Sequence, residues 1–174
     1  REDAPFEIES LDDPVLGELR IAVQNVGIPP HDALLYRGLG DNVVNEYLEG
    51  APRVGTGRSR AVVDAVANGE VDVALVWGPV AGYLAGGAEQ ELVVQPVTPQ
   101  FEPPFRTHSF PMTIGMRPGD QALRDRLDVA LANRWDDINA ILEEYGVPTE
   151  PLPQPQVSPP PEGVVRVGFV SPTV

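Results

Sequence analysis

The 174-residue chain contains no cysteine, which excludes disulfides, thiolate metal sites and cysteine nucleophiles. It also contains no lysine, since all 12 basic residues are arginine, and its formal net charge is −14. So acidic a chain is a poor match for nucleic acid or anionic lipid, whose phosphates attract cationic surfaces. No apolar run approaches the roughly 18 residues that predict a membrane span, and no signal-peptide pattern opens the chain. If the protein is exported, we expect this sequence to be its mature form, without membrane insertion.

Apolar runs and helix signals alternate through the first hundred residues. Strands are predicted at 18–24, 43–48, 71–77 and 92–99, and helices around 30–38, 56–69 and 79–85. This alternation predicts an α/β fold with a mainly parallel sheet flanked by helices. The most apolar run, 71–77, is typical of a strand covered on both faces. It ends on Trp77, which places the indole at the carboxyl edge of the sheet, where open α/β sheets bind ligands.

The second half of the chain has a different pattern. Residues 101–111 are rich in proline and aromatic side chains and predict an irregular crossing segment that leads to a last strand at 112–117. Asp120 is expected to cap a long amphipathic helix that bends near Asn133 and ends at Gly146. The sequence thus divides into a linker (1–14), an α/β lobe (15–118), C-terminal helices (119–147) and a proline-rich tail (148–174).

The proline-rich tail favours polyproline II and no packed structure. Near its end it contains the apolar run VVRVGFV, residues 164–170, which would either add an edge strand or stay loose. No internal repeat is present. We therefore expect one compact α/β unit with a proline-rich strap at one end.

Few residues suggest chemistry on their own. The segment GTGRS precedes a predicted helix and indicates a weak anion site at Thr56, Arg58 and Ser59, with an ordinary capped helix as the alternative. The two histidines, His31 and His108, are far apart and are expected to make single hydrogen bonds rather than bind metal. No nucleophile elbow or Ser/His/Asp set occurs. We therefore predict a protein that is not an enzyme and carries no cofactor and no metal.

Several blocks together carry a family resemblance. They are LRIAVQ (19–24), IPPHDALLYRGL (28–39), DAVANGEVDVALVWGP (64–79) and TIGMRPGDQALRD (113–125). Over residues 10–148 the chain resembles the periplasmic solute-binding-protein-like partners encoded with quinoprotein methanol dehydrogenases, of the MxaJ/XoxJ type. The resemblance implies a type II periplasmic binding protein fold, in which two α/β lobes close over a cleft. It implies one complete lobe here, plus the C-terminal helices of the partner lobe, while the first lobe has no counterpart.

The chain departs from the wider superfamily where amino acids are held. Amino-acid-binding members place an acidic residue after the equivalent of strand 71–77 and a Gly-Ser/Thr turn after the first strand. Here the first position is Trp77-Gly78 and the second is 28–31, Ile-Pro-Pro-His. An ammonium buried without a carboxylate would be left unpaired at a high cost. We therefore expect an apolar, aromatic cleft, with core packing of the indole as the alternative; its candidate residues are Gln24, Pro30, His31, Trp77, Gly78 and Tyr83.

Two functions follow from this resemblance as expectations. The first is a non-catalytic periplasmic accessory factor that engages a quinoprotein (PQQ) methanol dehydrogenase, with its cytochrome c as a further candidate partner, and aids its maturation or activation. The second is the solute-binding component of an ABC-type importer for a small apolar or alcohol-like ligand. A cleft without a zwitterion clamp suits either a protein segment or an uncharged solute.

Overall fold

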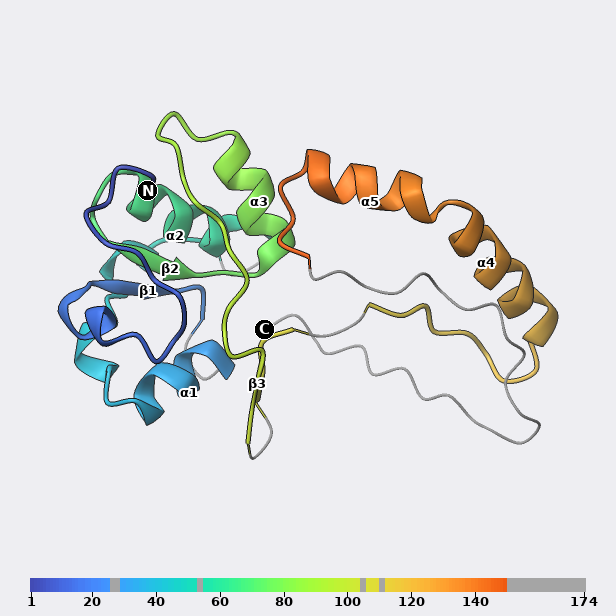
Figure 1. The fold of residues 1–174 in the computed structure, drawn as a ribbon, viewed down its shortest axis with the longest axis horizontal. Helices are drawn as coiled ribbons and strands as arrows, with labels where there is room; N and C mark the ends of the chain where they lie inside the picture. The colour runs from blue at the N-terminus through green and yellow to red at the C-terminus, as the bar shows by residue number, and fades with distance from the viewer. Residues whose placement is uncertain (26–28, 53–54, 104–105, 110–111, 150–174) are drawn as a thin grey trace.

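The computed structural model describes residues 1–25, 29–52, 55–103, 106–109 and 112–149 (Figure 1). An α/β lobe occupies one side of the molecule, and two helices extend from it as an arm. The predicted tail, including 164–170, lies outside the described residues. None of the helices within the described part of the chain is long and apolar enough to cross a membrane.

A parallel pair of strands forms the centre of the lobe. β1 (Ile21–Val23) pairs with β2 (Val73–Leu75), with Ile21 opposite Val73. An isolated parallel bridge joins Ile21 to Val43 on the other edge of β1. The pairing is parallel because a helix returns the chain to the same end of the sheet between the two strands. The predicted α/β class is confirmed, although the sheet is smaller than expected.

Two helices cover opposite faces of this sheet (Figure 1). α1 (Pro29–Tyr36) packs Leu34 against Ile21 and Val23, and all three side chains are buried. α2 (Gly57–Ala67) packs Val62 against Ala22 on the other face. Since neighbouring residues of a strand point to opposite faces, β1 supplies both halves of the core.

The predicted helices of the lobe are confirmed, with ends close to those expected. α1 begins at paired prolines, whose fixed φ suits a first helical turn. Thr56 occupies the N-cap position of α2, and Gly69, which follows its C-cap, has a φ of +72°. α3 (Gly78–Gly86) has proline in its first turn and packs beside α2.

The C-terminal helices form the arm, which we define as residues 112–149. α4 (Gln121–Asn133) and α5 (Trp135–Glu144) meet at Arg134, so the predicted bend is confirmed. Neither helix contains a buried residue. Figure 1 shows both helices projecting away from the lobe, which the arm touches through its last residues, beside α3.

Three predicted strands are wrong. Residues 43–48 contribute only the bridge at Val43 and then a 3₁₀ turn, η3 (Glu46–Leu48). Residues 92–99 pack Leu92 and Val97 against the core without strand pairing, and Pro96 lacks the amide hydrogen that a central strand would donate. Residues 112–117 show no strand where the structure describes them. Apolar runs predict burial, but burial alone does not determine whether a segment pairs as a strand.

The crossing segment also differs from the prediction, because it contains a short hairpin. β3 (Phe101–Glu102) pairs antiparallel with β4 (Arg106–Thr107). The segment at the start of the chain packs on the lobe: Leu11 is buried, and Phe6 and Ile8 contact the core. Two further 3₁₀ turns, η1 (Pro14–Glu18) and η2 (Gly40–Asn42), complete the lobe.

Candidate functional site

The carboxyl ends of β1 and β2 bring two predicted site residues together. Gln24 directly follows β1, and Trp77 lies two residues after the end of β2. The backbone amide of Trp77 donates to Gln24 Oε1 at 3.3 Å. Trp77 is 36% exposed, so its indole is not buried in the sheet. The structure thus places an amide and a partly exposed aromatic ring at the edge where ligands bind this class of fold.

A second amide at the same edge is held by an arginine from α2. Arg58 Nη1 donates to Asn25 Oδ1 at 2.9 Å, and Arg58 Nε is buried without a hydrogen-bond partner among the described residues. Among the predicted anion-site residues, Thr56 makes no side-chain cap bond and is exposed, whereas Ser59 is buried in the core. Arg58 therefore faces the sheet edge, but the three residues do not form a joint surface site.

The remaining predicted cleft residues lie on two helices, α1 and α3. Pro30 and His31 lie in the first turn of α1, and His31 Nδ1 is 3.7 Å from Asp32 Oδ1. Gly78 starts α3, next to Trp77. Tyr83 lies further along α3 and stacks on Tyr145 of the arm, with ring centroids 6.0 Å apart. The structure thus gathers Gln24, Trp77 and Gly78 at the carboxyl edge and directs Tyr83 toward the arm.

The arm meets α3 through an unusually close backbone approach. A Cβ placed on Gly82 would lie 2.2 Å from the carbonyl oxygen of Gly146, so only glycine fits at position 82. Pro148 similarly lies against Gly78. The end of α5 is therefore fixed to the helix that starts at the candidate site.

One polar cluster was not predicted from the sequence. The Arg37 guanidinium, at the end of α1, pairs with Glu102 of β3 and also donates from Nε to Asp12 Oδ1 at 2.8 Å. His108 Nε2 lies 3.2 Å from Glu102 Oε2, and the His108 side chain is 1% exposed. The expected single hydrogen bond of His108 is confirmed. Because Arg37 lies 25 residues from Asp12 and 65 from Glu102, no local spacing signals its contacts.

The ion pairs of this cluster favour the charged form of the glutamate. The hydrogen bond from Arg37, assisted by that from His108, lowers the pKa of Glu102, although partial burial opposes the shift. The same carboxylate raises the pKa of Arg37. The cluster fixes the hairpin from which the arm departs, and it does not resemble a metal site. Within the described residues, no group of three or more histidine, aspartate or glutamate side chains could hold a metal ion.

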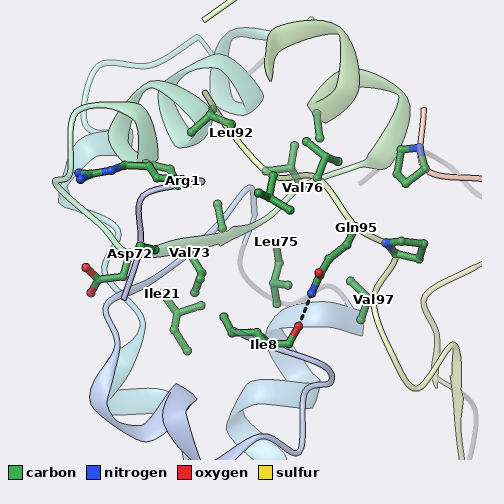
Figure 2. Close-up of a pocket in the computed structure, with 18 of the residues that line it drawn as sticks. Arg1, Ile8, Ile21, Asp72, Val73, Leu75, Val76, Leu92, Gln95 and Val97 are labelled. Atoms are coloured by element: carbon green, nitrogen blue, oxygen red, sulfur yellow. Dashed lines mark hydrogen bonds between the residues drawn. The ribbon is translucent and has the colours of Figure 1, made fainter. Parts of the chain in front are cut away.

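A cavity of about 870 Å³ runs along β2 and is also lined by Ile21 of β1 (Figure 2). Its walls are β2, the segment 92–98 and the first residues of the chain. Figure 2 shows Gln95 reaching across to Ile8, whose carbonyl oxygen it contacts at 2.6 Å. Trp77 and Gln24 do not line this cavity, whereas Gly78 does, so the cavity reaches the carboxyl-edge site at the start of α3.

Comparisons with known proteins bear on both sites. No protein-family model matches the chain. Protein MoxJ of Methylorubrum extorquens is 28% identical over 162 residues, which cover 87% of this chain and 54% of MoxJ. The crystal structure of the periplasmic binding protein XoxJ from Methylobacterium extorquens AM1 matches with a TM-score of 0.69 at 28% identity, covering 87% of this chain and 66% of XoxJ.

A second solved structure agrees in fold. MxaJ from Methlophaga aminisulfidivorans MPT matches with a TM-score of 0.67 at 21% identity, over 84% of this chain and 63% of MxaJ. The chain spans about half the length of MoxJ and about two thirds of XoxJ. Over most of its own length, the chain is therefore homologous to MoxJ and XoxJ and has the fold of a periplasmic binding protein.

Proposed function

We propose that this protein is a non-catalytic periplasmic accessory factor that binds a quinoprotein methanol dehydrogenase and aids its maturation or activation. We extend the proposal to the cytochrome c of that enzyme as a further partner. The observation that carries it is the homology to MoxJ and XoxJ over 87% of the chain. The location in the periplasm is part of the same proposal, since XoxJ is a periplasmic binding protein.

The chemistry of the carboxyl edge supports a protein partner over a charged solute. The residues that follow the two strands there are Gln24, Asn25 and Trp77, which are neutral. The arginine that reaches this edge, Arg58, is already bound to Asn25. A zwitterion bound there would leave its ammonium without a carboxylate from these positions, whereas a partly exposed indole is a typical anchor in protein interfaces.

The arm completes the proposal at the level of domains. Its helices present apolar side chains that are exposed in this chain, including Leu123, Ile141 and Tyr145. We propose that residues 119–147 pack against a second α/β lobe, corresponding to the part of XoxJ that has no counterpart here. The match to XoxJ leaves out 13% of this chain. This share contains fewer residues than the arm does, so part of the arm belongs to the shared fold.

A genetic test is direct. In a strain that lacks this protein, the activity of the quinoprotein methanol dehydrogenase in periplasmic extracts should fall, and the wild-type gene should restore it. The Trp77→Ala variant should restore it poorly, whereas Tyr36→Ala, an exposed aromatic residue at the far end of α1, should restore it fully. Normal assembly and activity of the enzyme in the deletion strain would remove the proposal.

An uncharged solute remains a second candidate, because an indole beside the Gln24 amide suits an alcohol-like ligand. This function would make the protein the solute-binding component of an ABC-type importer. A ligand that binds only the folded protein must raise its melting temperature. A thermal-shift screen with short-chain alcohols and small apolar solutes should therefore give a shift with wild type that Trp77→Ala abolishes; no shift with any of them excludes this function.

A further inference from the structure

The two paired strands of the lobe are buried to different degrees. All three residues of β1 are buried, whereas all three of β2 are only partly buried, although the strands are neighbours. The difference follows from the cavity, which replaces a neighbour along β2. The space of about 870 Å³ is open to solvent, and beside a core strand it leaves room for a further packing element.

The backbone of β2 is open toward this cavity. Val73 donates to the carbonyl oxygen of Arg20, and Leu75 accepts from the amide of Gln24, so both residues pair with the β1 side. Successive residues of a strand direct their amide and carbonyl groups to opposite edges. The groups of Ala74 therefore point to the other edge, where no strand pairs with β2 among the described residues. An open edge with an apolar groove is the arrangement that accepts an added strand.

The lining of the cavity is acidic on balance. Glu2, Glu7, Glu9 and Asp72 line it, and Arg1 is the one basic residue among its lining residues. Glu2 also shares a hydrogen bond with the carboxyl group of Glu91, and this contact between two acids raises the pKa of Glu2. A strand that carries one positive charge would relieve this repulsion.

The chain contains one segment with these properties outside the described residues. In the run 164–170, every second residue from Val165 to Phe169 is apolar, and Arg166 is the only charged residue. The described part of the arm ends beside the cavity, since Pro148 lines it. Residues 150–163 are 14 residues, which in polyproline II would span about 43 Å, ample for the chain to turn back to β2.

We propose that residues 164–170 bind in this cavity as an added strand along the free edge of β2, within the same molecule. In this arrangement Val165, Val167 and Phe169 would cover the partly buried side chains of β2, and Arg166 would meet the acidic residues that line the cavity. The lobe then gains a third core strand that the alternation of the first hundred residues does not provide. This inference is independent of the dehydrogenase partner.

Amide exchange of Ala74, followed by NMR, tests the proposal. In the full chain the Ala74 amide should exchange at least tenfold more slowly than in a chain that ends at Gly163. A chain that ends at Val170 is the matched control and should retain the slow exchange. A synthetic peptide of residues 164–170, added to the chain that ends at Gly163, should restore it, whereas the same peptide with Val167→Asp should not.

Full-chain variants cover the case in which the shortened chain does not fold. Val165→Asp combined with Val167→Asp should accelerate exchange at Ala74, while Thr173→Asp, outside the segment, should not. Fast exchange at Ala74 in the full chain overturns the proposal. Slow exchange that persists without residues 164–174 also overturns it, because another segment or a small ligand then occupies the edge. Protection found only in a dimer overturns the assignment to the same molecule.

Discussion

At the scale of single residues, the contact between Arg37 and Glu102 links the lobe to the hairpin that leads into the arm. Both side chains are largely shielded, at 14% and 12% exposure, so solvent screens their attraction less than it does at the surface. His108 adds a second contact to the same carboxylate. We therefore expect this cluster to contribute to stability, whereas the exposed pair of Arg134 and Asp137 should contribute little.

Glu102→Gln should lower the free energy of unfolding by about 2 kcal/mol at pH 7, because a shielded, hydrogen-bonded charge is lost. The folded-state pKa of Glu102 is lowered, so its contribution is fully present above the unfolded value of about 4.3 and is lost as the pH falls through the folded value. Urea unfolding at pH 7 and pH 3 should show the difference from wild type shrinking at the lower pH.

The matched control for this variant is Asp137→Asn, which removes an exposed ion pair and should cost less than about 0.5 kcal/mol. An equal loss for Glu102→Gln at both pH values would show that the carboxylate charge is not what stabilises the hairpin.

Gly82→Ala tests the close approach of α3 and the end of α5. The added Cβ would lie 2.2 Å from the Gly146 carbonyl oxygen, so the backbones must separate, at a cost of about 1–3 kcal/mol. Gly86→Ala, in the same helix, meets nothing and should stabilise the protein by up to about 1 kcal/mol. Thermal unfolding of both variants checks this, and equal effects of the two would disprove the contact.

At the scale of secondary-structure elements, the helices of the lobe and its two paired strands could be predicted, whereas three further predicted strands do not form. Helix signals are local, and the prolines that open α1, the glycine after α2 and the leucine spacing of α4 all lie within a few residues of the element they define. A strand depends on a distant edge. Leu92 and Val97 are core residues as their sequence predicts, but nothing local shows that 92–99 fails to pair with β2.

In the candidate site, likewise, some contacts could be predicted from the sequence and others depend on the tertiary fold. Gln24 and Trp77 could be brought together from sequence because the carboxyl ends of neighbouring parallel strands share one edge. The stacking of Tyr83 on Tyr145 could not, since it depends on where the arm crosses α3. The contact of Arg37 with Glu102 likewise joins residues 65 positions apart.

Matched leucine-to-alanine substitutions in α1 and α4 should show that the lobe is tightly packed and that the helices of the arm are not. Leu34 is fully buried, so Leu34→Ala should cost about 2–5 kcal/mol. Leu123, in α4, is 46% exposed, and Leu123→Ala should cost less than about 0.5 kcal/mol in this chain. Urea unfolding followed by circular dichroism measures both. A large loss for Leu123→Ala would mean that the apolar side of α4 is already packed.

At the scale of the whole molecule, the chain combines a packed lobe, an arm with no buried residue in its helices, and a net charge of −14. The homology to MoxJ and XoxJ covers most of these parts, and in our proposal the arm presents the surface for a second lobe. The acidic charge does not define the carboxyl edge, where Gln24, Asn25 and Trp77 are neutral. A partly exposed indole beside amide side chains, with Arg58 already bound to Asn25, suits the proposed recognition of another protein.

The most direct measurement is the binding of purified quinoprotein methanol dehydrogenase to this chain, immobilised on an interferometry sensor, beside a panel of free amino acids. We predict saturable binding of the enzyme, weakened about 30-fold by Trp77→Ala, as expected for the loss of about 2 kcal/mol at an aromatic anchor. We predict no binding of the amino acids. Binding of a free amino acid at the carboxyl edge, or no binding of the dehydrogenase, would contradict the account.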